Sequence, residues 1–169
     1  NNQIMAHVLE HNLLSATQYA SRPNSSTAMA LQTIYNKLHK HKHNQQKTLA
    51  IYIDLSKAYD TISHTKLIDK LRDQFNFSPD TITFIQSYFT NRQQTTHTQH
   101  AKSDMQTITD GIPQGSTLST TFFLLYINDI IKTVPHSHVY TFADDTTLVI
   151  AAKDIDALQT LAQSELTSL

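Results

Sequence analysis

The sequence contains no cysteine and almost no glycine, and it has no long apolar run. Without cysteine there is neither a disulfide framework nor a thiolate metal site, which is typical of a reducing compartment. No apolar run reaches the roughly 18 residues that a membrane span needs, and the N-terminal segment has no basic stretch that leads into an apolar one. We therefore expect an intracellular protein, nuclear or cytoplasmic, without a secretory signal or a membrane partner.

The only two glycines, Gly111 and Gly115, lie within one short segment, GIPQGS (111–116). A chain of this length ordinarily holds about 12 glycines, at a usual frequency of ~7%. Glycine permits a positive φ and lets a ligand come close to the backbone. The segment is therefore a candidate ligand loop, and the alternative is a Pro-Gly turn followed by a helix cap.

The length and the charge balance indicate one folded domain. The chain has 169 residues, of which 39% are apolar and 16% are charged, so it is neither a coiled coil nor a charge-rich disordered tail. The formal net charge is −1, whereas a protein that wraps nucleic acid alone is usually basic. A nucleic-acid partner would therefore be held locally, or with the help of parts outside this chain.

Hydrophobic periodicity predicts an α+β fold, with an antiparallel sheet and helices packed on one face. Residues 92–110, rich in Thr, Gln and His, are expected to form a polar two-stranded meander. Strand-like runs cover 48–55 and the two halves of 139–152. Helical patterns cover 3–14, from Ser25 or Ser26 to about Lys40, 65–75, from Pro79 to about Phe89, 117–132 and 154–169.

Three aspartates stand at the ends of predicted strands. Asp54 ends the first strand, and Asp144 and Asp145 form the bend between the later two. Such charges are costly unless they are paired or metal-bound, adjacent carboxylates repel each other, and no Lys or Arg lies within seven residues of the pair. Oxygen ligands without His or Cys suit Mg²⁺ or Mn²⁺. The pattern predicts a metal site with Asp144 inner and Asp145 looser, and the alternative is a solvated hairpin turn.

Three other side chains accompany these motifs. Gln114 offers a donor and an acceptor without charge, which suits a base pair or a sugar, and Ser116 can cap the helix that follows. Tyr59 lies five residues after Asp54. Its ring can stack on a sugar or block a 2′-hydroxyl, the group that distinguishes RNA precursors from DNA precursors. Ordinary packing against the sheet is the alternative for Tyr59.

Three segments, in this order and spacing, resemble motifs A, B and C of a reverse transcriptase palm. They are IYIDLSKAYD (51–60), GIPQGSTLS (111–119) and YTFADD with the following residue (140–146). Over about residues 10–165 the sequence is similar to non-LTR (LINE-type) retrotransposon polymerases of the Jockey/CR1 kind. The resemblance implies a ferredoxin- or RRM-like palm at 48–169, preceded by partial fingers helices at 1–47 and truncated before motif D and the thumb.

The resemblance also implies how the motifs act. Asp54, Asp144 and Asp145 would be catalytic and would hold two Mg²⁺ (or Mn²⁺) ions, with the backbone carbonyl of Leu55 as a further ligand. One ion would activate the primer 3′-hydroxyl, and the other would clamp the triphosphate while pyrophosphate is released.

The implied nucleotide site consists of Tyr59 as the sugar gate and of Gln114 with Gly115 as the lining of the incoming-nucleotide pocket. The implied partners are an RNA template, a DNA primer, dNTPs and the remaining parts of a retrotransposon polyprotein, namely fingers, thumb and endonuclease.

Two other functions stay open. The chain can be a truncated, catalytically inactive relic that binds nucleic acid or another subunit weakly at most, and this hypothesis shares every motif with the polymerase. It can also be a compact α+β domain whose acidic cluster simply binds a cation. The His/Lys run at 37–47 is interpreted as a solvated helix end. The spacing of His39 and His43 also permits metal binding, and the lysines can contact a phosphate backbone.

Overall fold

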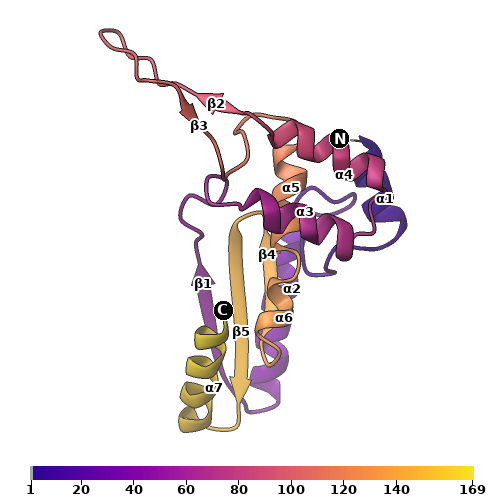
Figure 1. The fold of residues 1–169 in the computed structure, drawn as a ribbon. Coiled ribbons are helices and arrows are strands. Elements are labelled where there is room, and N and C mark those ends of the chain that lie inside the picture. The colour runs from indigo at the N-terminus through magenta and orange to yellow at the C-terminus, as the bar shows by residue number, and fades with distance from the viewer. Residues whose placement is uncertain (1) are drawn as a thin grey trace. The chain divides into compact units, whose positions relative to one another are not determined.

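The computed structural model describes residues 2–169 (Figure 1). It is a mixed α+β structure with a small antiparallel sheet, which confirms the expected fold class at that level. Two compact units are present: the segments up to Ser56 and from Ile127 to Leu169 form the first, and Lys57–Tyr126 form the second. None of the described helices is both long and apolar enough to cross a membrane.

The first unit is built on a three-stranded antiparallel sheet with the order β1-β5-β4. Its strands are β1 (Lys47–Ile53), β4 (His138–Phe142) and β5 (Asp145–Ala152). The register pairs Ile53 with Thr146, and Phe142 with Asp145. The end of β1 and the start of β5 therefore meet at the same end of the sheet.

Helices cover both faces of this sheet, which differs from the expected single helical face. Figure 1 shows α2 (Thr27–His43) behind the sheet, and α6 (Ile130–Thr133) and α7 (Ile155–Ser168) in front of it. The central strand explains the difference, because side chains alternate between the faces of a strand. Leu148 and Val149 point to opposite faces of β5 and both are fully buried, so each face needs a cover.

The front face of the sheet carries the apolar core of the first unit. Val134, Val139 and Leu148 are buried together, and three partly buried isoleucines pack against them, namely Ile51, Ile53 and Ile130. Burying a side chain of this size contributes about 1.5–3 kcal/mol. This core holds β1, β5 and β4 in the register that places the strand ends together.

The N-terminal segment of the first unit covers the outer edge of β4. α1 (Asn2–Glu10) is followed by a chain that pairs with the strand: Tyr19 N donates to Thr141 O at 2.8 Å, and Thr141 N donates to Thr17 O at 2.9 Å. These bonds satisfy backbone groups that an edge strand would leave open. α1 ends earlier than the predicted 3–14, and Asn12 after it takes a positive φ of 51°.

The second unit is mainly helical, with a two-stranded arm. It contains α3 (His64–Asp73), α4 (Pro79–Phe89), β2 (Gln93–Gln94), β3 (Gln106–Thr107) and α5 (Ser119–Ile127). The meander predicted at 92–110 is confirmed as this short ladder, β2 with β3, extended by a bridge between His97 and Lys102.

Several helix boundaries follow from local chemistry. Of the two predicted caps Ser25 and Ser26, it is Ser26 that accepts a hydrogen bond from Met29 N, and Ser78 accepts one from Thr81 N before Pro79, as Ser at an N-cap does. The single helix predicted at 117–132 is wrong, because α5 ends at Ile127 and α6 begins at Ile130. At the break, the Asn128 side chain donates to Leu13 O at 2.9 Å and accepts from Ser15 N at 2.7 Å.

Candidate functional site

The bend between β4 and β5 is a two-residue turn. Phe142 pairs with Asp145, so Ala143 and Asp144 form the loop, one residue earlier than the bend predicted at Asp144 and Asp145. Ala143 has a φ of 54°, a left-handed conformation that costs a residue with a Cβ roughly 1–2 kcal/mol. Asp144 therefore stands in the turn itself, and Asp145 is the first residue of the central strand.

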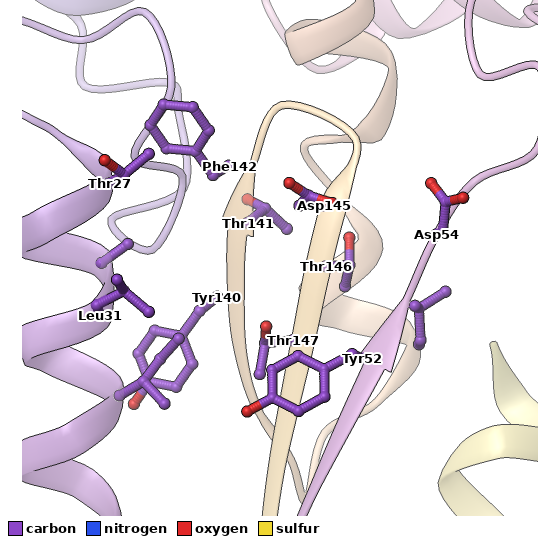
Figure 2. A pocket seen from close by; sticks show the side chains of 13 residues that line it. Thr27, Leu31, Tyr52, Asp54, Tyr140, Thr141, Phe142, Asp145, Thr146 and Thr147 are labelled. Carbon is purple, nitrogen blue, oxygen red and sulfur yellow. The ribbon is translucent and has the colours of Figure 1, made fainter.

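Asp54 and Asp145 line one cavity of about 430 Å³ in the first unit. Asp54 directly follows β1, and Figure 2 shows both side chains at the same end of the sheet. Within the described residues neither carboxylate forms an ion pair or a hydrogen bond with another side chain. Asp144 is half-buried and does not line this cavity.

The donor chemistry at this end of the sheet suits a divalent cation. Two exposed carboxylates without cationic neighbours supply oxygen ligands, which Mg²⁺ and Mn²⁺ prefer. In residues 2–169, however, no group of three or more His, Cys, Asp or Glu side chains is gathered closely enough to hold a metal ion. The structure thus brings two of the three predicted ligands, Asp54 and Asp145, to one cavity, whereas the third, Asp144, does not line it.

The rest of this cavity is lined by aromatic, aliphatic and threonine side chains. The back face of the sheet contributes Tyr52 and Tyr140, and α2 contributes Leu31 (Figure 2). Burial raises the pKa of the Tyr140 hydroxyl, and the nearby Tyr19 raises it further. The sequence analysis did not predict this aromatic lining. The pattern that indicates it is the alternation of aromatic residues in YTF and IYI beside the aspartates.

Thr146 is a buried polar residue beside these carboxylates. It follows Asp145 and is 2% exposed, and its hydroxyl oxygen has no hydrogen-bond partner among the described residues. An unsatisfied buried hydroxyl costs about 1–3 kcal/mol.

In the second unit, the segment that begins with Gly111 is clasped against the chain that follows motif A. Gly111 N donates to Ile62 O at 2.7 Å, and Ile112 N donates to Tyr59 O at 2.8 Å. The Gly111 carbonyl accepts from His64 Nε2 at 2.6 Å. A Cβ at Gly111 would lie 2.9 Å from Asp60 O. The close approach at Gly111 is thus made by the protein's own backbone.

Gly115 differs from Gly111, because its surroundings are open. It has a φ of 83°, and a Cβ there would have no neighbour within 4 Å. Beside it, Gln114 Nε2 donates to Asp60 Oδ1 at 3.3 Å. Gln114 and Asp60 line a second cavity of about 710 Å³, together with Lys57 and Arg92. Sequence reasoning missed Asp60, although it is the last residue of the motif A segment.

Tyr59 and Ser116 both contact other side chains of the second unit. The Tyr59 ring stacks on Phe123 of α5, with centroids 5.1 Å apart and planes 11° apart, so ordinary packing accounts for its position. Ser116 Oγ accepts from the Tyr88 hydroxyl at 2.7 Å and from Leu118 N at 3.4 Å. It therefore supports the turn just before α5, which begins at Ser119.

The His/Lys run at the end of α2 is only partly solvated. His41 is half-buried, its Nδ1 is bonded to Gln46 Oε1 at 2.8 Å, and its ring lies 5.8 Å from that of His138. Burial lowers the pKa of His138, and the charges of Lys37, His41 and Lys40 lower it further.

Comparison with known proteins shows to which family the chain belongs. The family model for reverse transcriptase (RNA-dependent DNA polymerase) matches residues 1–168. The chain therefore belongs to the reverse transcriptase family, which confirms the resemblance carried by motifs A, B and C. Over 145 residues it is 25% identical to the RNA-directed DNA polymerase from mobile element jockey of Drosophila melanogaster. That alignment covers 82% of this chain and 16% of the relative, so the chain spans a small part of the relative's length.

Proposed function

We propose that this chain is the palm region of a non-LTR retrotransposon reverse transcriptase, which extends a DNA primer on an RNA template with dNTPs. The family and the jockey relative support this proposal. The single observation that carries it is the shared cavity of Asp54 and Asp145, two carboxylates far apart in the chain. The turn that contains Asp144 adjoins Asp145.

The proposed metal ligands are Asp54, Asp144 and Asp145, with the backbone carbonyl of Leu55. Two Mg²⁺ or Mn²⁺ ions, when bound, supply activation of the primer 3′-hydroxyl and neutralisation of charge on the triphosphate. The protein's part is to place unpaired carboxylates at the ends of two adjacent strands, where the apolar core fixes them. Asp144 would join them through adjustment of the two-residue turn.

The proposed nucleotide site consists of Tyr59, Gln114 and Gly115. Stacking on Phe123 fixes the Tyr59 ring, which is what a steric gate for a sugar requires. The open surroundings of Gly115 leave its backbone accessible to a ligand. We further propose that residues 1–47 are fingers-derived helices and that 48–169 form the ferredoxin-like palm. The remaining fingers, the thumb and the endonuclease would be partners from the same polyprotein.

The test is primer extension on poly(rA)/oligo(dT) with Mn²⁺, in which wild type is compared with Asp144→Asn and Asp145→Asn. We expect each variant to lose about a hundred-fold or more of the activity, as is typical when a charge-stabilising group is removed. Asp156→Asn, an exposed position in the first turn of α7, is the matched control and should keep full activity.

The other outcomes decide between the alternatives. Equal extension by wild type and Asp144→Asn would reject catalysis by this chain. No extension by any variant would favour the inactive relic. Titration calorimetry with Mn²⁺ completes the experiment, because cation binding without extension would favour a simple cation-binding domain.

A further inference from the structure

The contact between Asp60 and Gln114 determines which end of the Gln114 amide faces Asp60. A carboxylate can only accept hydrogen bonds, whereas a primary amide has a donor end and an acceptor end. Because Gln114 Nε2 donates to Asp60 Oδ1, the Gln114 carbonyl oxygen is left free for other donors. An apolar or amide neighbour at position 60 would impose no such orientation.

The Asp60 backbone is held by several contacts, which limits where its carboxylate can lie. Asp60 N donates to Lys57 O at 2.8 Å, and the preceding carbonyl, that of Tyr59, accepts from Ile112 N. Gly111 packs directly on the Asp60 backbone. The clasp around Gly111 thus brings motif A and motif B into register and sets the distance between Asp60 and Gln114.

The cavity beside this pair suits the sugar-phosphate part of a nucleotide. Lys57 and Arg92 line it and offer positive charge beside the carboxylates of Asp60 and Asp110. Arg92 is held over the Tyr88 ring at 5.0 Å from the centroid. Among the described residues that line it there is no aromatic ring on which a base could stack. A free acceptor oxygen in such a cavity matches a hydroxyl donor.

We propose that Asp60 is a positioning residue that orients the Gln114 amide, so that its carbonyl oxygen accepts a hydrogen bond from a sugar hydroxyl of the incoming nucleotide. The ligand class rests on the proposed function, but the orientation of the amide does not. Asp60 is exposed, and its packing contact with Gly111 is made by the backbone. Side-chain substitutions there should therefore leave the fold intact.

The first test follows the Gln114 side-chain amide by NMR in the full chain labelled with ¹⁵N-glutamine, with the signal assigned by its loss in Gln114→Glu. Asp60→Asn should shift it, because an Asn amide accepts and donates and so allows both orientations of Gln114. Asp110→Asn is the matched control. It removes a charge from the same cavity, but the Asp110 carboxylate is bonded to Thr109. An unchanged signal in Asp60→Asn, or an equal shift in Asp110→Asn, would overturn the positioning role.

The second test measures the preference for dTTP over 2′,3′-dideoxy-TTP, as incorporation on poly(rA)/oligo(dT) and as binding in Mn²⁺. Asp60→Asn should reduce this preference about five-fold, the worth of one neutral hydrogen bond, whereas Asp110→Asn should leave it unchanged. A general loss of activity caused by removing the charge would affect both nucleotides equally and would cancel in the ratio of their incorporation.

The two proposals fail differently. A preference for dTTP that is equal in wild type and Asp60→Asn overturns the sugar-hydroxyl assignment, even though nucleotide is bound. If no nucleotide is bound or incorporated, the proposed function and the ligand assignment fail together, and the NMR signal still decides whether Asp60 orients Gln114.

Discussion

The two turns that carry the predicted site residues are built from different amino acids. The segment from Gly111 to Gly115 uses both glycines of the chain, whereas the bend between β4 and β5 places Ala143 at a φ of 54°. All three positions are left-handed, so conformation alone does not explain where glycine stands. At Gly111 a side chain would meet the Asp60 backbone. Glycine is thus required by contact at Gly111, whereas at Gly115 no neighbour excludes a side chain and only the positive φ favours glycine.

The remaining left-handed positions show how the chain makes its other turns without glycine. Of the eight non-glycine residues with positive φ in the described chain, four are asparagine, namely Asn12, Asn24, Asn76 and Asn91. Asparagine tolerates this region better than other residues with a Cβ. Because other residues take a positive φ elsewhere in the described chain, φ favours glycine at Gly115 without demanding it, and the proposed access of a nucleotide to the backbone offers a reason for it.

Gly111→Ala should have the largest effect on stability. We expect a loss of about 3 kcal/mol in the free energy of unfolding, since roughly 1–2 kcal/mol of backbone strain adds to an overpacking cost of about 1–3 kcal/mol. Equilibrium unfolding in urea measures it. A loss below about 1 kcal/mol would mean that the contact with Asp60 is loose.

Gly115→Ala, the matched substitution, should cost only about 1 kcal/mol, because its surroundings are open and strain alone acts. If a nucleotide contacts the Gly115 backbone, this variant should lower the free energy of dTTP binding by more than it lowers the free energy of unfolding. Fluorescence competition with a labelled nucleotide, alongside urea unfolding, separates the two effects. Normal nucleotide affinity would show that Gly115 serves the turn only.

The elements defined by local chemistry could be predicted from the sequence. Ser26 caps its helix, α4 begins at Pro79, and the bend falls within one residue of its predicted place, because each depends on neighbours within four residues. The strand-like runs also placed Asp54 at the end of a strand, and the pairing of Ile53 with Thr146 shows that this strand end meets the start of β5.

The features that sequence reasoning missed depend on partners distant in the chain. The break after α5 follows from Asn128 bonding to Leu13 and Ser15. The bond between Asp60 and Gln114 likewise joins motifs that only the fold brings together. Hydrophobic periodicity predicts neither contact, because it describes only neighbours along the chain and both contacts join side chains that are distant in sequence.

Ala143→Gly tests whether alanine strains the bend between β4 and β5. It should raise the free energy of unfolding by about 0.5 kcal/mol, because relief of roughly 1–2 kcal/mol of left-handed strain is partly offset by about 0.5–1 kcal/mol of lost chain stiffness. Hydrogen exchange of β4 and β5 amides should slow accordingly. Faster exchange would show that Ala143 stabilises the bend by a contact rather than straining it.

The smallest effect is expected at the other end of the same hairpin, where His138 begins β4. Because burial and nearby positive charges lower the pKa of His138 in the folded chain, protonation favours the unfolded state. The stability from neutral His138 is fully present above its unfolded pKa of about 6.5 and is lost as pH falls through the lower, folded value. The protection factors of the β4 and β5 amides against hydrogen exchange should therefore fall more steeply with decreasing pH in wild type than in His138→Gln, while those of the Gly111 segment behave alike in both. Equal pH profiles of the hairpin in the two proteins would show that neither burial nor the charges of Lys37, His41 and Lys40 lower the pKa of His138 enough to affect stability.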